Sequence, residues 1–178
     1  GDPAIQSEIA RLKALRPDLI ERYVLEQFGP GALIPREDLD RPLTPRELQR
    51  LAAERQIGLG NHTMDHVILT TVGRAEVESQ LAGACRYLED ATGAPVRTVA
   101  YPNGDYDQQI VDVARGLGHT VGVTTLRRKE LVAQMHQHRY ELGRFQFERQ
   151  TDLMAQMRAI RSGFHLADAL RRVKGRSG

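Results

Sequence analysis

Short apolar segments alternate with amphipathic segments in the middle of the chain, and this alternation restricts the fold more than any other feature. Residues 57–59, 96–100 and 120–123 are brief apolar runs typical of buried strands. Residues 74–90 and 110–117, which separate them, repeat apolar side chains at helical spacing. A strand–helix–strand order with short links favours parallel strands joined by right-handed crossovers. The sequence therefore predicts an α/β fold.

The predicted strands are too few for a complete barrel. Residues 145–147 add one further short strand. A closed (β/α) barrel has eight strands and roughly 250 residues, whereas this chain has 178 residues. We therefore expect a partial sheet whose first strands precede Gly1. Its unpaired edge would allow self-association between copies of the chain.

Helices are predicted on both sides of this central region. Residues 5–15 and 18–28 carry apolar side chains at helical spacing and are separated by Arg16-Pro17. Thr44-Pro45-Arg46-Glu47 has the pattern of a capping box with proline at the first helical position, and predicts a helix to about residue 55. Residues 151–160 and 164–173 predict two C-terminal helices.

Composition excludes several classes of protein. A formal net charge of +2 argues against a dedicated nucleic-acid binder. No apolar run reaches the length of a transmembrane segment. Cys85 is the single cysteine, which excludes an internal disulfide framework and a cysteine-rich zinc site. We expect Cys85 to be a small buried side chain rather than a nucleophile.

The strongest chemical signal is a histidine pair. Residues 60–66 read Gly-Asn-His-Thr-Met-Asp-His, which places His62 and His66 four positions apart. On a helical turn this spacing puts both imidazoles on one face, where they can share a divalent metal ion. The pair follows a predicted strand at its C-terminal end, where α/β folds build their sites. The alternative is an exposed helical turn that happens to hold two histidines.

A second signal follows the next strand. Residues 100–106 read Ala-Tyr-Pro-Asn-Gly-Asp-Tyr. Pro102 and Gly104 favour a tight loop that presents backbone N–H groups outward. Such groups can stabilise a developing oxyanion. The alternative is an ordinary β-to-α turn.

Together, in this order, the two segments resemble the polysaccharide deacetylase family, the NodB-homology carbohydrate esterases. Residues 61–66 are similar to its His-(Ser/Thr)-x-x-His metal motif, and residues 99–106 to its Phe-Ala-Tyr-Pro-x-Gly-x-Tyr loop. Residues 142–145, Leu-Gly-Arg-Phe, are similar to a Leu-x-Arg-Ile segment of relatives. The resemblance covers about residues 44–162. It implies a distorted (β/α) barrel, of which residues 44–178 are the C-terminal part and residues 1–43 a helical insertion before the histidine strand.

The resemblance also implies a chemistry: hydrolysis of an acetyl amide or ester on an acetylated polysaccharide or oligosaccharide. His62 and His66 would bind a divalent metal, usually zinc, although cobalt and nickel also suit two imidazoles. The backbone N–H of Asn103 would be the oxyanion donor. The substrate-binding residues of the loop would be Tyr101, Pro102, Gly104 and Tyr106, although Tyr106 fits packing beneath the loop equally well.

One departure from the family is large. The family's first motif ends in Asp-Asp, which supplies the catalytic base and the third metal ligand, and this chain has no Asp-Asp pair. Asp65 lies between the histidines and is expected to point off their face. With two ligands and no base, zinc is expected to be held weakly and the chain alone to be weakly active or inactive.

Two other readings stay open. The alternative to a deacetylase is a non-catalytic glycan-binding or scaffold relative that keeps the His-x-x-x-His loop as structure. A metal-binding α/β domain of the amidohydrolase type would need another third ligand, for which the sequence shows no candidate. The compartment is open between the cytoplasm and the envelope of a bacterium.

Overall fold

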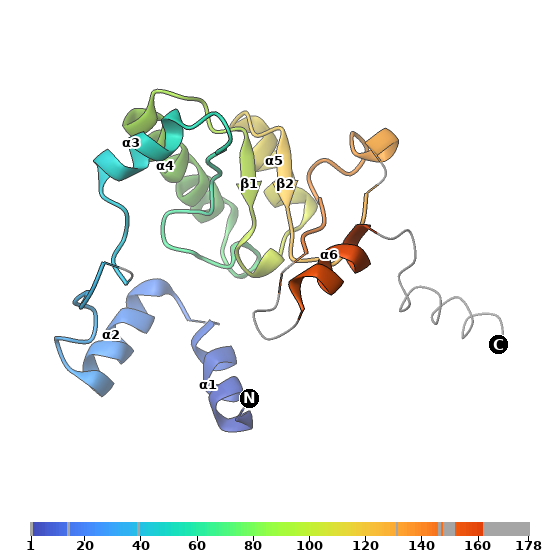
Figure 1. Ribbon diagram of the computed structural model, residues 1–178. Coiled ribbons are helices and arrows are strands. Elements are labelled where there is room, and N and C mark those ends of the chain that lie inside the picture. The colour runs from blue at the N-terminus through green and yellow to red at the C-terminus, as the bar shows by residue number, and fades with distance from the viewer. Residues whose placement is uncertain are drawn as a thin grey trace.

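The computed structural model describes residues 2–13, 15–38, 40–130, 132–145, 147 and 152–161. Its centre is a small parallel sheet, as the alternation predicts (Figure 1). Strand β1 (Thr98–Ala100) pairs with β2 (Val121–Val123), with Val99 opposite Gly122. Isolated parallel bridges extend the sheet on both sides, from Asn61 to Val99 and from Val123 to Leu142. Four chain segments therefore run side by side in the order in which they occur along the sequence.

Two predicted strands were misplaced. The run at 57–59 forms no strand, and pairing begins only at Asn61. Ile57 is 43% exposed, and its N–H donates at 3.0 Å to the carbonyl oxygen of Glu54 in the turn after the preceding helix. The run at 145–147 is not a strand at its described residues, and Leu142 makes the bridge instead. The chain then turns, and the N–H of Arg144 donates to the carbonyl oxygen of Leu126 at 2.8 Å. Within the described residues the sheet does not close into a barrel.

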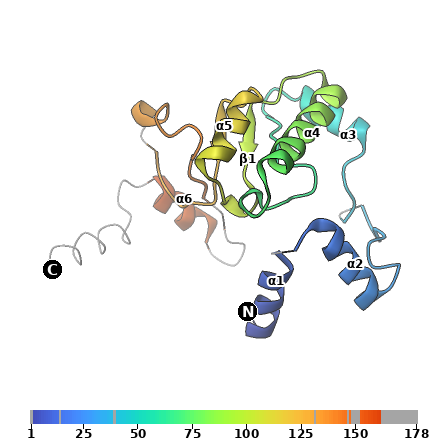
Figure 2. The same cartoon turned by 180° about the vertical axis from the view of Figure 1, so that it is seen from behind.

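Two helices cover one face of the sheet (Figure 2). These are α4 (Arg74–Thr92) and α5 (Gln108–Gly116), which pack against each other. Burial follows the predicted helical spacing, and the core consists of Leu69, Val77, Leu81, Val99, Tyr101, Ile110, Val111, Val113, Ala114 and Tyr140. In Figure 1 no helix of the described chain lies over the opposite face of β1 and β2. The first and last residues of each strand are accordingly only half-buried.

The cysteine lies in the helical layer, as expected. Cys85 is buried, and its Sγ lies 3.6 Å from Nε2 of His119. Nδ1 of His119 lies 3.1 Å from the carbonyl oxygen of Ala114, so it is Nδ1 that carries the ring proton. Burial raises the pKa of the Cys85 thiol and lowers the pKa of His119. A neutral, enclosed pair of this kind supports the packing role over a nucleophilic one.

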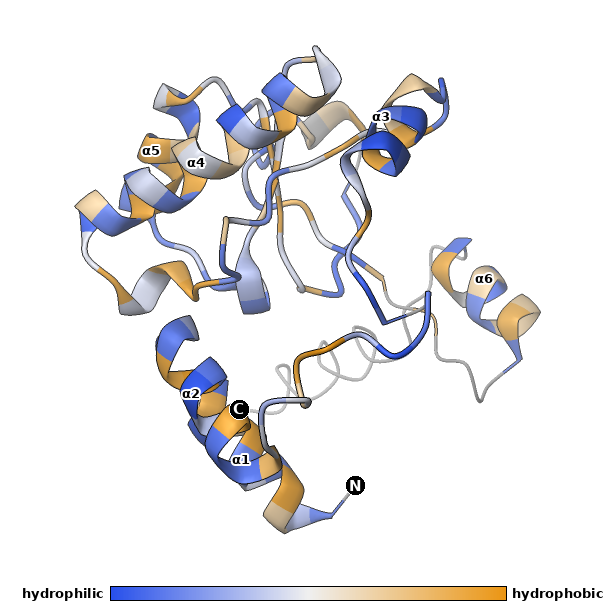
Figure 3. Cartoon of the chain, turned by 90° about the vertical axis from the view of Figure 1, so that its left-hand side faces the viewer, coloured by the Kyte–Doolittle hydropathy of each residue, from blue (hydrophilic) through white to orange (hydrophobic). Residues whose placement is uncertain are grey.

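Two short helices, α1 (Pro3–Lys13) and α2 (Pro17–Phe28), form an N-terminal pair beside one another (Figure 3). The Tyr23 hydroxyl on α2 donates to Glu8 on α1 at 2.7 Å. Neither helix has a buried residue. The turn between them approaches the C-terminal end of β1, and Nζ of Lys13 lies 3.5 Å from Oδ1 of Asn103.

The remaining helices follow the sequence closely. Helix α3 (Pro45–Ala53) begins with the predicted capping box, in which Thr44 and Glu47 bond each other's backbone N–H. Short 3-10 turns lie at Leu69–Thr71 (η1), Pro102–Gly104 (η2) and Val132–Gln134 (η3). Helix α6 (Leu153–Arg161) matches the first C-terminal prediction, and the second, 164–173, lies outside the described residues. No described helix has the length and hydropathy that a membrane span requires.

Candidate metal and oxyanion site

The histidine loop and the loop after β1 start from neighbouring parallel segments and lie at the same edge of the sheet (Figure 1). Asn61 anchors the first loop and is fully buried. Its Nδ2 donates to the carbonyl oxygen of Leu81 at 2.8 Å, and its Oδ1 accepts from the N–H of Thr63 at 2.9 Å. The residue directly before His62 is therefore fixed to both the sheet and α4.

The structure brings the two histidines together, but not on a helical turn. The rings of His62 and His66 meet edge to face, with centroids 4.7 Å apart and planes at 84°. Thr63 and His66 have φ angles of 66° and 56°, in the left-handed region, where a helical turn would need about −63°. The backbone N–H groups of Met64 and Asp65 both donate at 3.1 Å to the side chain of Gln80 on α4. The expected helical turn was wrong: two residues of the loop have left-handed φ angles, and the N–H groups of Met64 and Asp65 are held by the buried side chain of Gln80.

One hydrogen bond sets the tautomer of His62. Its Nδ1 lies 2.6 Å from the carbonyl oxygen of Ala100, at the end of β1. A carbonyl oxygen only accepts, so Nδ1 must carry the proton. In the neutral ring Nε2 is then the nitrogen with a lone pair. Histidines that bind metals use this arrangement, because the second hydrogen bond orients the ring and fixes the tautomer.

Both imidazoles line a cavity of about 350 Å³. The loop after β1 contributes Asn103 to the wall of this cavity, and the chain just after Leu142 contributes Arg144. The N-terminal helix pair and its turn contribute Lys13, Leu15, Pro17 and Ile20. The cavity is thus enclosed by parts of the chain that are far apart in sequence. No pattern in the sequence pointed to the helix-pair residues, whereas Arg144 belongs to the segment 142–145 already singled out.

A third ligand is missing from the described part of the chain. No group of three or more His, Cys, Asp or Glu side chains there is placed to hold a metal ion. Asp65 also borders the cavity, but its Oδ2 accepts from Nε2 of Gln80 at 2.8 Å. The two imidazoles therefore fit a divalent ion as two of its ligands, short of the three that protein sites normally supply.

The loop after β1 places a backbone donor beside this cavity. Asn103 has φ 58° and ψ −7°, inside η2. The hydroxyl of Thr125 donates to the Asn103 carbonyl oxygen at 3.1 Å and holds the peptide in place. No acceptor for the Asn103 N–H is found among the described residues. Gly104 has φ 85°, and a Cβ there would collide with Oγ1 and the backbone N of Thr125, so the loop needs glycine at this position.

The two tyrosines of the loop support it from below. Tyr101 is 2% exposed, stacks on Tyr106 with centroids 5.0 Å apart, and donates from its hydroxyl to the carbonyl oxygen of Tyr140 at 3.0 Å. Burial raises the pKa of both phenols, that of Tyr106 to about 12. Pro102 is buried as well. Of the four predicted substrate-binding residues, only Tyr101 borders the histidine cavity, whereas Gly104 and Tyr106 border a separate shallow depression.

Glu141 links Tyr106 to His138. It accepts from the Tyr106 hydroxyl at 2.6 Å, and Nδ1 of His138 lies 2.5 Å from its other oxygen. These hydrogen bonds, first from Tyr106 and then from His138, lower the pKa of Glu141. Glu141 therefore anchors His138, which does not line the histidine cavity. His165 lies outside the described residues.

Comparison with known proteins identifies the family. The sequence profile of the family described as polysaccharide deacetylase matches residues 19–122, more than half of the chain. The chain belongs to the polysaccharide deacetylase family. YxkH of Bacillus subtilis (strain 168), which is provisionally named a polysaccharide deacetylase, is 25% identical over 83 residues, or 47% of this chain and 29% of YxkH.

Solved deacetylase structures share the fold. The deacetylase PplD of Streptococcus pyogenes, in complex with acetate, aligns with a TM-score of 0.60 at 18% identity, over 78% of this chain and 56% of PplD. BC0361 from Bacillus cereus aligns with a TM-score of 0.61 at 19% identity, over 81% of this chain and 48% of that one. The chain thus spans about half the length of these structures and under a third of YxkH.

Proposed function

We propose that this polysaccharide deacetylase chain contributes the histidine pair and the oxyanion loop to metal-dependent hydrolysis of acetyl groups on a glycan. The observation that carries the proposal is the bond from Nδ1 of His62 to the Ala100 carbonyl oxygen, with His66 packed against the same ring. It fixes a ligand tautomer at the C-terminal edge of a parallel sheet. Family membership supports the glycan as substrate.

Each residue of the site has a defined part in the proposed reaction. His62 and His66 hold a divalent ion, in the first instance zinc, through their lone-pair nitrogens. When bound, such an ion polarises the acetyl carbonyl and lowers the pKa of a water molecule. The N–H of Asn103 donates to the acetyl oxygen as that oxygen gains negative charge, while Thr125 and Gly104 keep the peptide in its left-handed conformation. The water molecule gives a proton to the catalytic base as its oxygen bonds to the acetyl carbon. The C–N or C–O bond to the sugar then breaks, the leaving nitrogen or oxygen takes up that proton, and acetate is released.

The third ligand and the catalytic base form a separate part of the proposal. No described carboxylate joins the histidines, and Asp65 is engaged by Gln80. We propose that both groups come from an Asp-Asp strand outside these 178 residues, with residues 44–178 as the C-terminal part of the barrel and residues 1–43 as an insertion. The isolated chain would then bind zinc weakly and turn over poorly, because general base catalysis is worth roughly 10²–10⁴-fold.

Acetate release tests this proposal. The substrate is an N-acetylglucosamine tetramer, incubated with zinc and either the chain alone or the chain extended by the residues that its gene encodes before Gly1. We expect zinc-dependent acetate release from the extended protein, little from the chain alone, and loss of release in His66→Ala of the extended protein. Equal zinc-dependent turnover by the chain alone would contradict the need for outside carboxylates.

A second candidate is a glycan-binding or scaffold relative without catalysis. The shortage of ligands in the described part of the chain favours it. The two candidates differ in their affinity for zinc. A catalytic site gains tight zinc binding when the extended protein is used, whereas a structural histidine loop does not.

A further inference from the structure

Three buried polar side chains connect the junction of α5 and β2 to the histidine loop. His119 lies at this junction, Cys85 lies on α4, and Asn61 directly precedes His62. The Sγ of Cys85 is 3.3 Å from Nδ2 of Asn61 and 3.6 Å from Nε2 of His119. We call Asn61, Cys85 and His119 the buried polar row. It reaches from the far side of the helical layer to the residue beside a proposed metal ligand.

The protons of the buried polar row are ordered from one end. The Ala114 carbonyl oxygen accepts from Nδ1 of His119 at 3.1 Å, so Nε2 of His119 carries a lone pair. The Cys85 thiol therefore donates to Nε2, and its sulfur accepts from Nδ2 of Asn61. Burial keeps both titratable groups neutral, because it raises the pKa of the thiol and lowers the pKa of the imidazole. Every donor in the row has an acceptor when the amide nitrogen of Asn61 faces Cys85.

The orientation of the Asn61 amide decides the backbone of the histidine loop. With its nitrogen toward Cys85, the amide turns Oδ1 to Thr63 and accepts the Thr63 N–H at 2.9 Å. Thr63 has a φ of 66°, in the left-handed region that a β-branched residue rarely adopts. A side-chain acceptor two residues earlier in the chain stabilises such a turn. This turn lies between His62 and His66, whose ring centroids are 4.7 Å apart.

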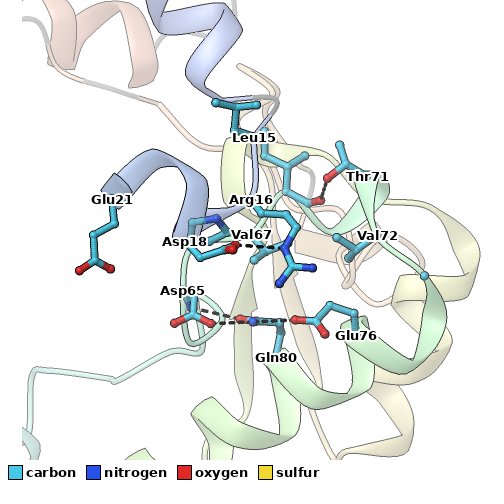
Figure 4. A pocket seen from close by; sticks show the side chains of 13 residues that line it. Leu15, Arg16, Asp18, Glu21, Asp65, Val67, Thr71, Val72, Glu76 and Gln80 are labelled. Carbon is cyan, nitrogen blue, oxygen red and sulfur yellow. Dashed lines mark hydrogen bonds and ion pairs between the residues drawn. The ribbon is translucent and has the colours of Figure 1, made fainter. Parts of the chain in front are cut away.

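The second half of the loop has a separate anchor on α4. The side chain of Gln80 accepts the N–H groups of Met64 and Asp65 at 3.1 Å. Its Nε2 donates to Asp65 at 2.8 Å and to Glu76 at 3.0 Å, and Figure 4 shows Gln80 between these two carboxylates. Gln80 thus holds the peptides that follow Thr63, whereas the buried polar row acts on the N–H of Thr63 itself.

We propose that Cys85 and His119 are positioning residues of the metal site and act through Asn61. They keep the amide of Asn61 in the orientation that holds the turn between the two histidines left-handed. This inference rests on the proposed function, and extends it to two side chains that do not line the histidine cavity. Removing the thiol takes away one of the two acceptors of the Asn61 amide nitrogen, so the amide is held less firmly.

Zinc affinity and amide hydrogen exchange of the chain test the proposal together. In Cys85→Ala we expect the zinc affinity, measured by calorimetry, to fall about 3-fold, which is less than the loss expected when a direct partner of a ligand is removed. The Thr63 amide should exchange at least about 10-fold faster in NMR spectra. His119→Phe leaves the thiol without its acceptor and should change both quantities in the same direction. Cys85→Ser keeps a group that donates and accepts, and should restore both to within about 2-fold of wild type.

Two further variants separate positioning from packing. Val113→Ala shortens a buried side chain of α5 outside the row and should destabilise the fold without changing zinc affinity or Thr63 exchange. Asn61→Ser has a side chain too short to reach Cys85, so adding Cys85→Ala to it should lower zinc affinity no further.

The outcomes separate this inference from the proposed function. If Cys85→Ala changes neither zinc affinity nor Thr63 exchange, or acts equally in the Asn61→Ser background, the positioning role is wrong and the proposed function stands. The same conclusion follows if Val113→Ala lowers zinc affinity as much as Cys85→Ala does. If the wild-type chain binds no zinc through its histidines, the proposed function is contradicted, and the positioning role with it.

Discussion

The imidazole of His62 is tied to the end of β1, because its Nδ1 lies 2.6 Å from the carbonyl oxygen of Ala100. The two residues are 38 positions apart in the chain. The next peptides after Ala100 lead into the loop that carries Asn103. One hydrogen bond therefore joins the proposed metal ligand to the strand that also positions the proposed oxyanion donor.

Replacing either histidine should weaken zinc binding. His62→Ala and His66→Ala each remove one of the two proposed imidazole ligands, and we expect the zinc affinity of the chain to fall by about 10-fold or more. Isothermal titration calorimetry measures the change. His136→Ala is the matched control, since His136 is exposed and does not line the cavity. Unchanged affinity in both site variants would remove the histidines from the metal site.

Gly104→Ala should destabilise the fold and distort the oxyanion loop. The residue has φ 85°, and the added Cβ would meet Thr125. Left-handed strain costs roughly 1–2 kcal/mol, and overpacking costs about as much again. Urea unfolding should show a loss of at least about 2 kcal/mol. Gly31→Ala, where Cβ meets nothing within 4 Å, should change stability by less than about 1 kcal/mol.

Tyr106→Phe should reduce the acid sensitivity of the fold. The pKa of Glu141 is lowered first by the hydrogen bond from Tyr106. A lowered pKa in the folded state adds stability above the ordinary value of 4.5, and that stability is lost as the pH falls through the folded pKa. The variant should be less stable than wild type at pH 6, and the difference should shrink by pH 3.

Unfolding free energies at both pH values measure this effect, and an NMR titration of Glu141 reads its pKa directly. Tyr87→Phe, at a half-exposed position on α4, is the control and should behave as wild type. A Glu141 pKa that is the same in wild type and Tyr106→Phe would contradict the assigned cause.

His119 should make the fold less stable in mild acid. Burial lowers the pKa of His119, so the unfolded chain takes up a proton at higher pH than the folded one. Stability should then fall as the pH drops below about 6.5. His119→Phe should be less stable at pH 7.5 but lose part of this pH dependence, in unfolding curves collected from pH 7.5 to 5.5. The slope should survive in His136→Ala, and its survival in His119→Phe would assign it to another group.

The sequence predicted the parallel order of the segments and the meeting of His62 with His66. Both follow from local patterns, apolar runs for the strands and a four-residue spacing for the histidines. The helical turn under the histidines was predicted wrongly because its backbone is decided by Gln80, a residue 14 positions after His66. The pattern of residue types in 60–66 does not predict the contact of this loop with Gln80.

The residues that surround the histidine cavity could not be predicted from the sequence for a similar reason. Lys13, Leu15 and Pro17 border the histidine cavity only because the α1–α2 pair folds back toward β1. The position of the helix pair depends on the irregular segment between α2 and α3. The turn residues of that segment predict that the chain bends, but they do not predict the direction in which it bends. The motif at residues 142–145 drew attention to Arg144, but its position beside the cavity could not be predicted from that motif.

The central claim is that His62 and His66 bind one metal ion through a fixed tautomer. Long-range ¹H–¹⁵N spectra of the imidazoles, recorded while zinc is added to the chain, test it most directly. The account predicts that Nε2 of His62 and one nitrogen of His66 shift together at the same zinc concentration, while Nδ1 of His62 keeps its proton. Imidazole signals that do not respond to zinc, or a His62 ring protonated at Nε2 in the neutral state, would contradict it.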